Sequence, residues 1–174
     1  MFILRGKYVL SALALVLVLA GSGWAQAPQP PASDPADLYR RAVKFLEQAE
    51  QQLNAGNIGE AKTQARQANA LFSLLQKDSA SLLAERKLTP QEEQQLAITQ
   101  KLADDTQAQA ERLMASATDK GKQGRELEAQ GKEEASQAAY RTSREEFHQA
   151  QILSIKSLIH ALRNQQQLFH FLSP

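Results

Sequence analysis

The sequence predicts an all-α protein, in which a four-helix antiparallel bundle or two stacked helical hairpins follow a signal peptide. After residue 33 the chain is dominated by Ala, Gln, Leu, Glu and Lys, which are good helix formers, whereas the β-branched residues Val and Thr are sparse. A single proline, Pro90, lies between Pro35 and Pro174. Apolar residues recur along each segment at the three- and four-residue spacing of one helix face. The sequence therefore contains almost no signal for β-strands.

The first 25 residues have the pattern of a secretory signal peptide. Arg5 and Lys7 form a basic start, residues 8–20 are an uninterrupted apolar run, and small residues follow at a plausible cleavage site. The apolar run is shorter than the roughly 20 residues that a membrane-spanning helix needs. We therefore expect cleavage after residue 25, a proline-rich linker over residues 26–33 and no stable membrane span afterwards. An uncleaved membrane anchor is the alternative.

The first predicted helix begins after Asp34, which can cap it, with Pro35 in the first turn where a missing N–H does no harm. It runs to about Leu53. Its predicted buried face contains Leu38, Ala42, Phe45, Leu46, Ala49 and Leu53.

A short turn separates this helix from the second one. Gly56 can end the first helix in a left-handed conformation, and Asn57 is expected to cap the second, with Glu60 three residues on. The second helix is expected to reach about Lys87. Its apolar stripe contains Ile58, Ala61, Ala65, Ala68, Phe72, Leu75 and Leu82.

The clearest local signal in the chain is Thr89-Pro90-Gln91-Glu92, where Thr caps a helix, Pro occupies its first position and Glu reaches back to the cap N–H. We expect this third helix to bend or fray at Gly121 and Gly124, because each glycine costs about 1 kcal/mol relative to alanine. Its predicted face contains Leu96, Leu102, Ala103, Ala110, Leu113 and Ala117.

A fourth helix is predicted after Gly131, and it is expected to end near the C-terminus. Its apolar residues are Ala135, Ala138, Ala139, Phe147, Ala150, Leu158, Leu162 and Phe169. Short turns predict that the first two helices form one antiparallel hairpin and the last two a second, longer one. Buried alanines should bring paired axes close together, with aromatic side chains filling the space between the hairpins. We expect residues 34–174 to form one helical domain.

An internal repeat pairs residues 53–61 with residues 127–135, which share Leu, Ala, Glu and Ala in register. The first hairpin resembles the tetratricopeptide type, in which small residues at fixed positions let two helices approach. Phe45, Ala49, Ala61 and Ala68 match that pattern, and the second hairpin matches mainly at Ala135. The resemblance implies binding of a protein or peptide and no chemistry. The alternative is that any tight turn between alanine-rich helices needs small residues.

The charge and the cysteine content of the chain exclude several classes of function. The predicted leader carries two of the 20 basic residues and none of the 19 acidic ones, so the mature chain is nearly neutral. This balance argues against nucleic acid as a partner, because binding it requires clustered positive charge. Cysteine is absent, which excludes disulfides, thiolate metal sites and a lipid-bearing cysteine after the leader. Export without cysteine fits a bacterial envelope. We expect a periplasmic or secreted protein.

Glu145 and His148 stand at the Glu-x-x-His spacing of di-iron helical bundles, with both side chains on one helix face. Such a centre needs a second copy of the motif and two more glutamates, and neither His160 nor His170 has Glu three residues before it. A metal- or cofactor-binding periplasmic bundle that uses Glu145 and His148 is therefore the alternative hypothesis. The preferred prediction assigns no metal or cofactor.

No set of residues in the sequence has the spacing of a known catalytic motif. A serine-nucleophile elbow, a Ser-x-x-Lys pair and a glycine-rich phosphate loop are all missing. We therefore predict a non-catalytic interaction or scaffold protein of the cell envelope with a protein or peptide partner. The candidate partner-binding residues are Leu168, Phe169, Phe171 and Leu172, an apolar group at the chain end that must either dock on the helices or serve a partner.

Overall fold

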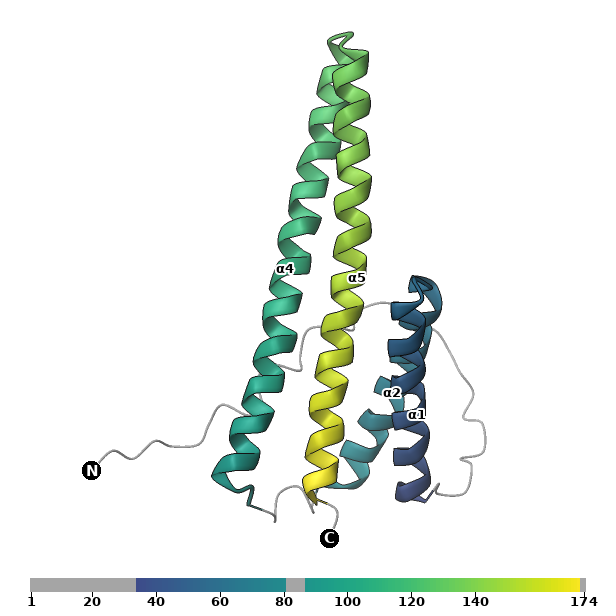
Figure 1. Ribbon diagram of the computed structural model, residues 1–174, viewed down its shortest axis with the longest axis vertical. Coiled ribbons are helices and arrows are strands. Elements are labelled where there is room, and N and C mark those ends of the chain that lie inside the picture. The colour runs from purple at the N-terminus through teal and green to yellow at the C-terminus, as the bar shows by residue number, and fades with distance from the viewer. Residues whose placement is uncertain (1–33, 81–86, 173–174) are drawn as a thin grey trace, which may run out of the picture. The chain divides into compact units, whose positions relative to one another are not determined.

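Four helices make up the part of the chain that the computed structural model describes, which is residues 34–80 and 87–172, with only the backbone of Leu172. In chain order they are α1 (Pro35–Asn54), α2 (Ile58–Asp78), α4 (Pro90–Ala129) and α5 (Glu133–Leu172). They pack as two antiparallel hairpins, α1 with α2 and α4 with α5, as Figure 1 shows. The all-α prediction of paired hairpins is confirmed. The predicted leader, the linker and Leu82 lie outside the described residues.

Local capping signals place most helix ends where the sequence predicted them. Asp34 accepts a hydrogen bond from the Ala36 N–H at 3.1 Å. Thr89 and Glu92 form the predicted capping box, with Thr89 N–H donating to the Glu92 carboxylate at 2.7 Å.

Two expectations about the ends of α2 are wrong. Asn57 does not cap α2, because its side-chain amide donates to Gln52 instead, at 2.7 Å. Helix α2 ends at Asp78, so Lys87 lies beyond it.

Both hairpins turn through the same backbone motif. Gly56 and Gly131 have φ of 81° and 72°, the left-handed region that glycine enters at no steric cost. The next residue donates back to a carbonyl five positions earlier, Asn57 to Gln52 and Lys132 to Leu127, both at 2.9 Å. These are Schellman motifs, which satisfy the last carbonyls of a helix.

The shared turn motif corrects the alignment of the internal repeat by one residue. Gly56 corresponds to Gly131, whereas the sequence alignment had paired it with Gln130. In the structural register the buried Ala61 corresponds to the buried Ser136, and Ala135 is exposed. The second hairpin therefore places serine where the first has alanine.

The apolar core lies between α1, α2 and the C-terminal half of α5. It contains Leu38, Ala42, Leu46 and Ala49 of α1, Ala61, Ala65, Ala68, Phe72 and Leu75 of α2, and Ile155, Ile159, Leu162 and Phe169 of α5. Aromatic rings do fill the space between the hairpins. Phe72 stacks on Phe169 at a centroid distance of 5.9 Å, and Tyr39 meets both rings edge-on. Among the described helices, none is long and apolar enough to cross a membrane.

Candidate functional site

Helix α5 is shared by two interfaces of different composition. On one side Ile155, Ile159, Leu162 and Phe169 join the apolar core with α1 and α2. On the other side it packs along the whole length of α4, which contributes no residue to that core. The buried residues of the α4–α5 interface are instead small. They are Ala103, Ala110, Ala117 and Gly124 of α4, and Ser136, Ser143, Ala150 and Ser157 of α5.

These eight residues recur every seven positions along each helix, and we call them the small-residue seam. Three serines donate across it to backbone carbonyls. Ser136 bonds to Gly124 at 2.9 Å, Ser143 to Ala117 at 2.7 Å and Ser157 to Ala103 at 2.8 Å. A step of seven forward along α4 matches a step of seven back along α5, so the seam keeps one register, as in an antiparallel coiled coil.

Polar contacts continue the seam towards the N-terminal end of α4 and the C-terminal end of α5. The Asn164 amide donates to the Leu96 carbonyl at 2.8 Å, in the same register as the serines. The Thr99 hydroxyl lies 3.0 Å from the side-chain oxygen of Gln167. Each such bond contributes about 0.5–1.5 kcal/mol net, so direct hydrogen bonds take over part of the role that apolar burial has in the other interface.

Helices α4 and α5 converge towards their turn, as Figure 1 shows. A Cβ atom on Gly124 would lie only 2.7 Å from the Tyr140 ring, so this position has room for glycine alone. Tyr140 covers Gly124 and donates its hydroxyl to Glu128 at 2.9 Å, and partial burial together with this bond raises the pKa of Tyr140. Helix α4 runs without interruption through Gly121 and Gly124, so the expected fraying there is wrong. Packing against Tyr140 and the seam compensates for the low helix propensity of glycine.

The seam serines were missed from the sequence. Serine is a weak signal for burial, whereas large apolar residues are a strong one. The predicted face therefore included Leu102, which is 48% exposed because the seam passes through its neighbour Ala103. The signal that could have found the seam was the strict seven-residue recurrence of small residues in both helices.

The half of the α4–α5 hairpin near the turn, residues 111–149, contains no residue of the apolar core, and we call it the distal arm. Figure 1 shows it extending beyond the turn between α1 and α2. No buried residue of the arm is larger than serine. Its α4 portion is about 28 Å long at 1.5 Å per residue.

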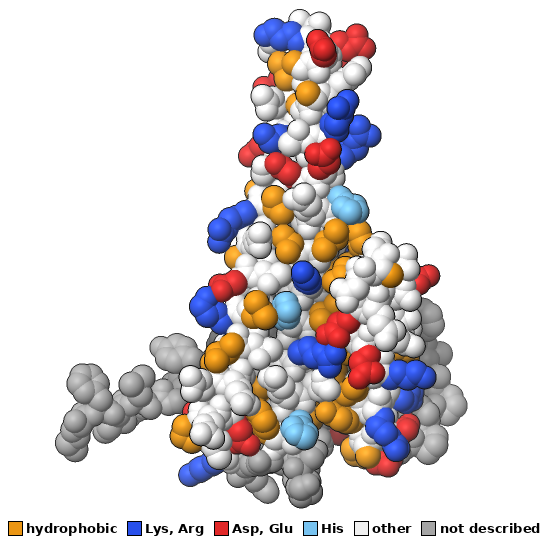
Figure 2. Space-filling view, viewed as in Figure 1, with side chains coloured by type: hydrophobic (Ala, Val, Ile, Leu, Met, Phe, Trp, Pro, Cys, Tyr) orange, Lys and Arg blue, Asp and Glu red, His pale blue; other side chains and the backbone are white. Residues whose placement is uncertain are grey.

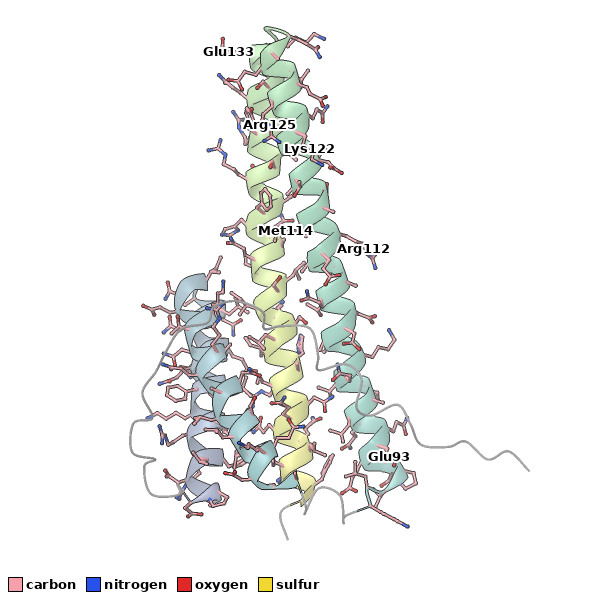
Figure 3. All side chains as sticks on the ribbon, turned by 180° about the vertical axis from the view of Figure 1, so that it is seen from behind. Glu93, Arg112, Met114, Lys122, Arg125 and Glu133 are labelled. Atoms are coloured by element: carbon pink, nitrogen blue, oxygen red, sulfur yellow. The ribbon has the colours of Figure 1, made fainter. Side chains whose placement is uncertain are left out.

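The outer surface of the arm is mostly polar. Figure 2 shows acidic and basic side chains interspersed over the viewed face, and Figure 3 marks Arg112, Lys122 and Arg125 along α4. Met114 is 38% exposed beside a shallow hollow of about 430 Å³ that α4 alone lines. Lys122 pairs with Asp119 at 3.1 Å at the edge of this hollow. The arm therefore has a mixed-charge outer surface, with the exposed Met114 near its base.

One ion pair links the two hairpins. Arg163 of α5 donates from Nε to Glu50 of α1 at 2.8 Å and from Nη2 to the second carboxylate oxygen, and it also donates to Gln166. The hydrogen bonds with Glu50 raise the pKa of Arg163. Both side chains are about one-third exposed, at 31% and 34%, so solvent screens the pair and limits its contribution to stability.

The residues of the metal-binding alternative lie on the outer surface of the arm. Glu145 and His148 are both exposed. No group of three or more His, Cys, Asp or Glu close enough to hold a metal ion occurs in residues 34–80 and 87–172. His160 lies elsewhere, half-buried beside the C-terminal end of α1, where burial and the nearby Lys156 lower its pKa and Glu50 opposes them. His160 and His170 lie farther along α5 than Glu145 and His148, so the three histidines do not converge on one site.

The C-terminal residues proposed to bind a partner have different environments. Phe169 is 9% exposed and packs between Tyr39 and Phe72, so it belongs to the core. Leu168 and Phe171 are half-buried, and the side chain of Leu172 lies outside the described residues. Partner binding by this segment stays a prediction.

Comparison with known protein families, with curated proteins and with solved structures finds no match to this chain.

Proposed function

We propose that this protein is an exported, non-catalytic interaction module of the bacterial cell envelope that binds a protein partner along its distal arm. The leader-like first 25 residues and the lack of cysteine support export to the periplasm. The resemblance of the first hairpin to tetratricopeptide-type hairpins implies the same class of function, which is protein or peptide binding.

The main support for the proposal is that only one half of the α4–α5 hairpin takes part in the apolar core. Residues 111–149 contribute nothing to the apolar core, yet the seam serines hold their two helices in a single register. This helical pair extends about 28 Å without contributing to the core. Its outer surface is therefore free to bind a partner. Exposed side chains such as Arg112 and Lys122, together with Met114, are then available to a partner.

A register-preserving deletion tests the role of the arm. Removing residues 111–124 and 136–149 takes two seven-residue repeats from each helix and brings Ala110 and Ala150 next to the original turn. The shortened protein should keep the apolar core, because no core residue is lost. We expect it to lose its partner in the native envelope.

Photo-reactive residues at Arg112, Lys122 and Arg125 identify that partner, with Lys62 and Arg66 on the exposed face of α2 as matched controls. A single adduct from the arm positions supports the proposal if it is absent from the α2 positions and from the shortened protein probed at Arg125, which the deletion retains. Identical adducts from both regions, or none from the arm, contradict it. Determining the mature N-terminus by mass spectrometry tests export, with residue 26 expected first.

A further inference from the structure

A small pocket lies between the C-terminal end of α1 and the middle of α5. Its volume is about 210 Å³, and its walls are Glu50, Leu53 and Asn54 of α1 and Lys156, Ile159 and His160 of α5. Drug-sized ligands occupy pockets of about 300–1,000 Å³, so this pocket has room for a smaller molecule of a few heavy atoms. It lies apart from the distal arm.

The charged group of the pocket that is available to a ligand is positive. Both carboxylate oxygens of Glu50 accept hydrogen bonds from Arg163, so this wall has little capacity for a bound cation. Lys156 makes no ion pair or hydrogen bond with any described residue. Its ammonium group is therefore the uncompensated charge at the pocket.

Two further groups define the chemistry. The Asn54 amide, which makes no hydrogen bond within residues 34–80 and 87–172, and the His160 ring can both donate to an oxygen atom. Leu53 and Ile159 supply an aliphatic wall. A cation, neutral donors and an aliphatic surface within one small space match a carboxylate on a short aliphatic chain.

We propose that this pocket binds a short-chain organic carboxylate, with Lys156 facing the carboxylate and Leu53 and Ile159 contacting the aliphatic chain. Neither the charge nor the shape of the pocket depends on residues 111–149, so the proposal is independent of partner binding by the arm. The low pKa of His160 leaves the ring mainly neutral at pH 7, and a bound anion should raise it.

The test is titration of the full mature protein with butyrate, followed by NMR. We expect saturable shifts at Leu53, Asn54, Ile159 and His160, and an upward shift of the His160 titration midpoint. Butyramide, the neutral isostere, should bind more weakly, and butylammonium should not bind. Inorganic phosphate lacks the aliphatic chain and should not shift Leu53 or Ile159.

Two substitutions separate recognition from non-specific charge effects. Lys156→Gln should weaken butyrate binding roughly two- to fivefold, the range of a solvent-exposed ion pair. Lys156→Arg should retain it, and Lys62→Gln, an exposed lysine of α2, should leave it unchanged. The inference is overturned if butyrate produces no saturable shift at His160, if butyramide or phosphate binds as well as butyrate, or if the Lys62 variant weakens binding as much as the Lys156 variant.

Discussion

The two faces of α5 form interfaces by opposite means. Towards α1 and α2 it presents large apolar side chains, and the rings of Phe72 and Phe169 stack there. Towards α4 it presents serine and alanine every seven residues, and hydrogen bonds from three serines to backbone carbonyls take over part of the role of apolar contact. One helix therefore carries a core stabilised by buried area and a seam stabilised by close approach.

The difference predicts how each interface responds to change. A core of large side chains loses stability when atoms are removed, because cavities form and apolar surface stays exposed. A seam of small side chains loses stability when atoms are added, because the helices must move apart. Truncation should be most harmful in the first interface and enlargement in the second.

The largest expected effect is at Phe72, which is fully buried in the core. Phe72→Ala should lower the free energy of unfolding by about 3–5 kcal/mol, because it removes a ring that contacts Tyr39 and Phe169. Urea denaturation followed by far-UV circular dichroism measures the loss. A loss below 1 kcal/mol would contradict the assignment of the core to this interface.

Enlarging the seam comes next. Ser143→Leu should cost about 1–3 kcal/mol, because the added atoms force α5 away from Ala117. Ser143→Ala is the matched control and should cost about 0.5–1.5 kcal/mol, the value of one hydrogen bond. Hydrogen exchange should show that the leucine variant exposes amides of residues 111–149 while α1 and α2 keep their protection. Equal loss of protection in both hairpins would mean that the two interfaces are not separable.

Two glycines three residues apart in α4 should respond with opposite signs. Gly121→Ala should raise stability by up to about 1 kcal/mol, since its Cβ would lie 3.4 Å from the Ser143 hydroxyl and the helix propensity improves. Gly124→Ala should lower stability because its Cβ would collide with Tyr140. The changes in stability are measured by thermal unfolding of both variants and of the double variant that combines Gly124→Ala with Tyr140→Ala. Failure of the Tyr140 change to reduce the cost of Gly124→Ala would refute the close approach.

The smallest expected effect is the pH dependence of stability that His160 causes. The pKa of His160 is lowered in the folded protein by burial and by Lys156, so folding favours its neutral form. Its contribution to stability is complete above the unfolded pKa of about 6.5 and is lost as the pH falls through the lower folded value. Urea unfolding at pH 7.5 and pH 5 should therefore show a pH-dependent loss that His160→Gln reduces. A pH-dependent loss of the same size in His160→Gln would contradict this role of His160.

The sequence by itself determined the features that depend on neighbouring residues. Asp34 and the Thr89–Glu92 capping box mark helix starts, and Gly56 and Gly131 mark the turns, because each group acts within five residues of its partner. The buried faces of α1 and α2 were also predictable, since large apolar residues recur there with helical spacing.

Only the tertiary structure decided what the long hairpin buries and where the chain end packs. A serine is buried favourably only where an acceptor faces it, and the acceptors of Ser136, Ser143 and Ser157 lie 12, 26 and 54 residues away along the chain. Phe169 likewise joins the core because α1 and α2 place Tyr39 and Phe72 against it. Periodicity shows which residues share a helix face, but burial depends on the surface that another helix brings to that face.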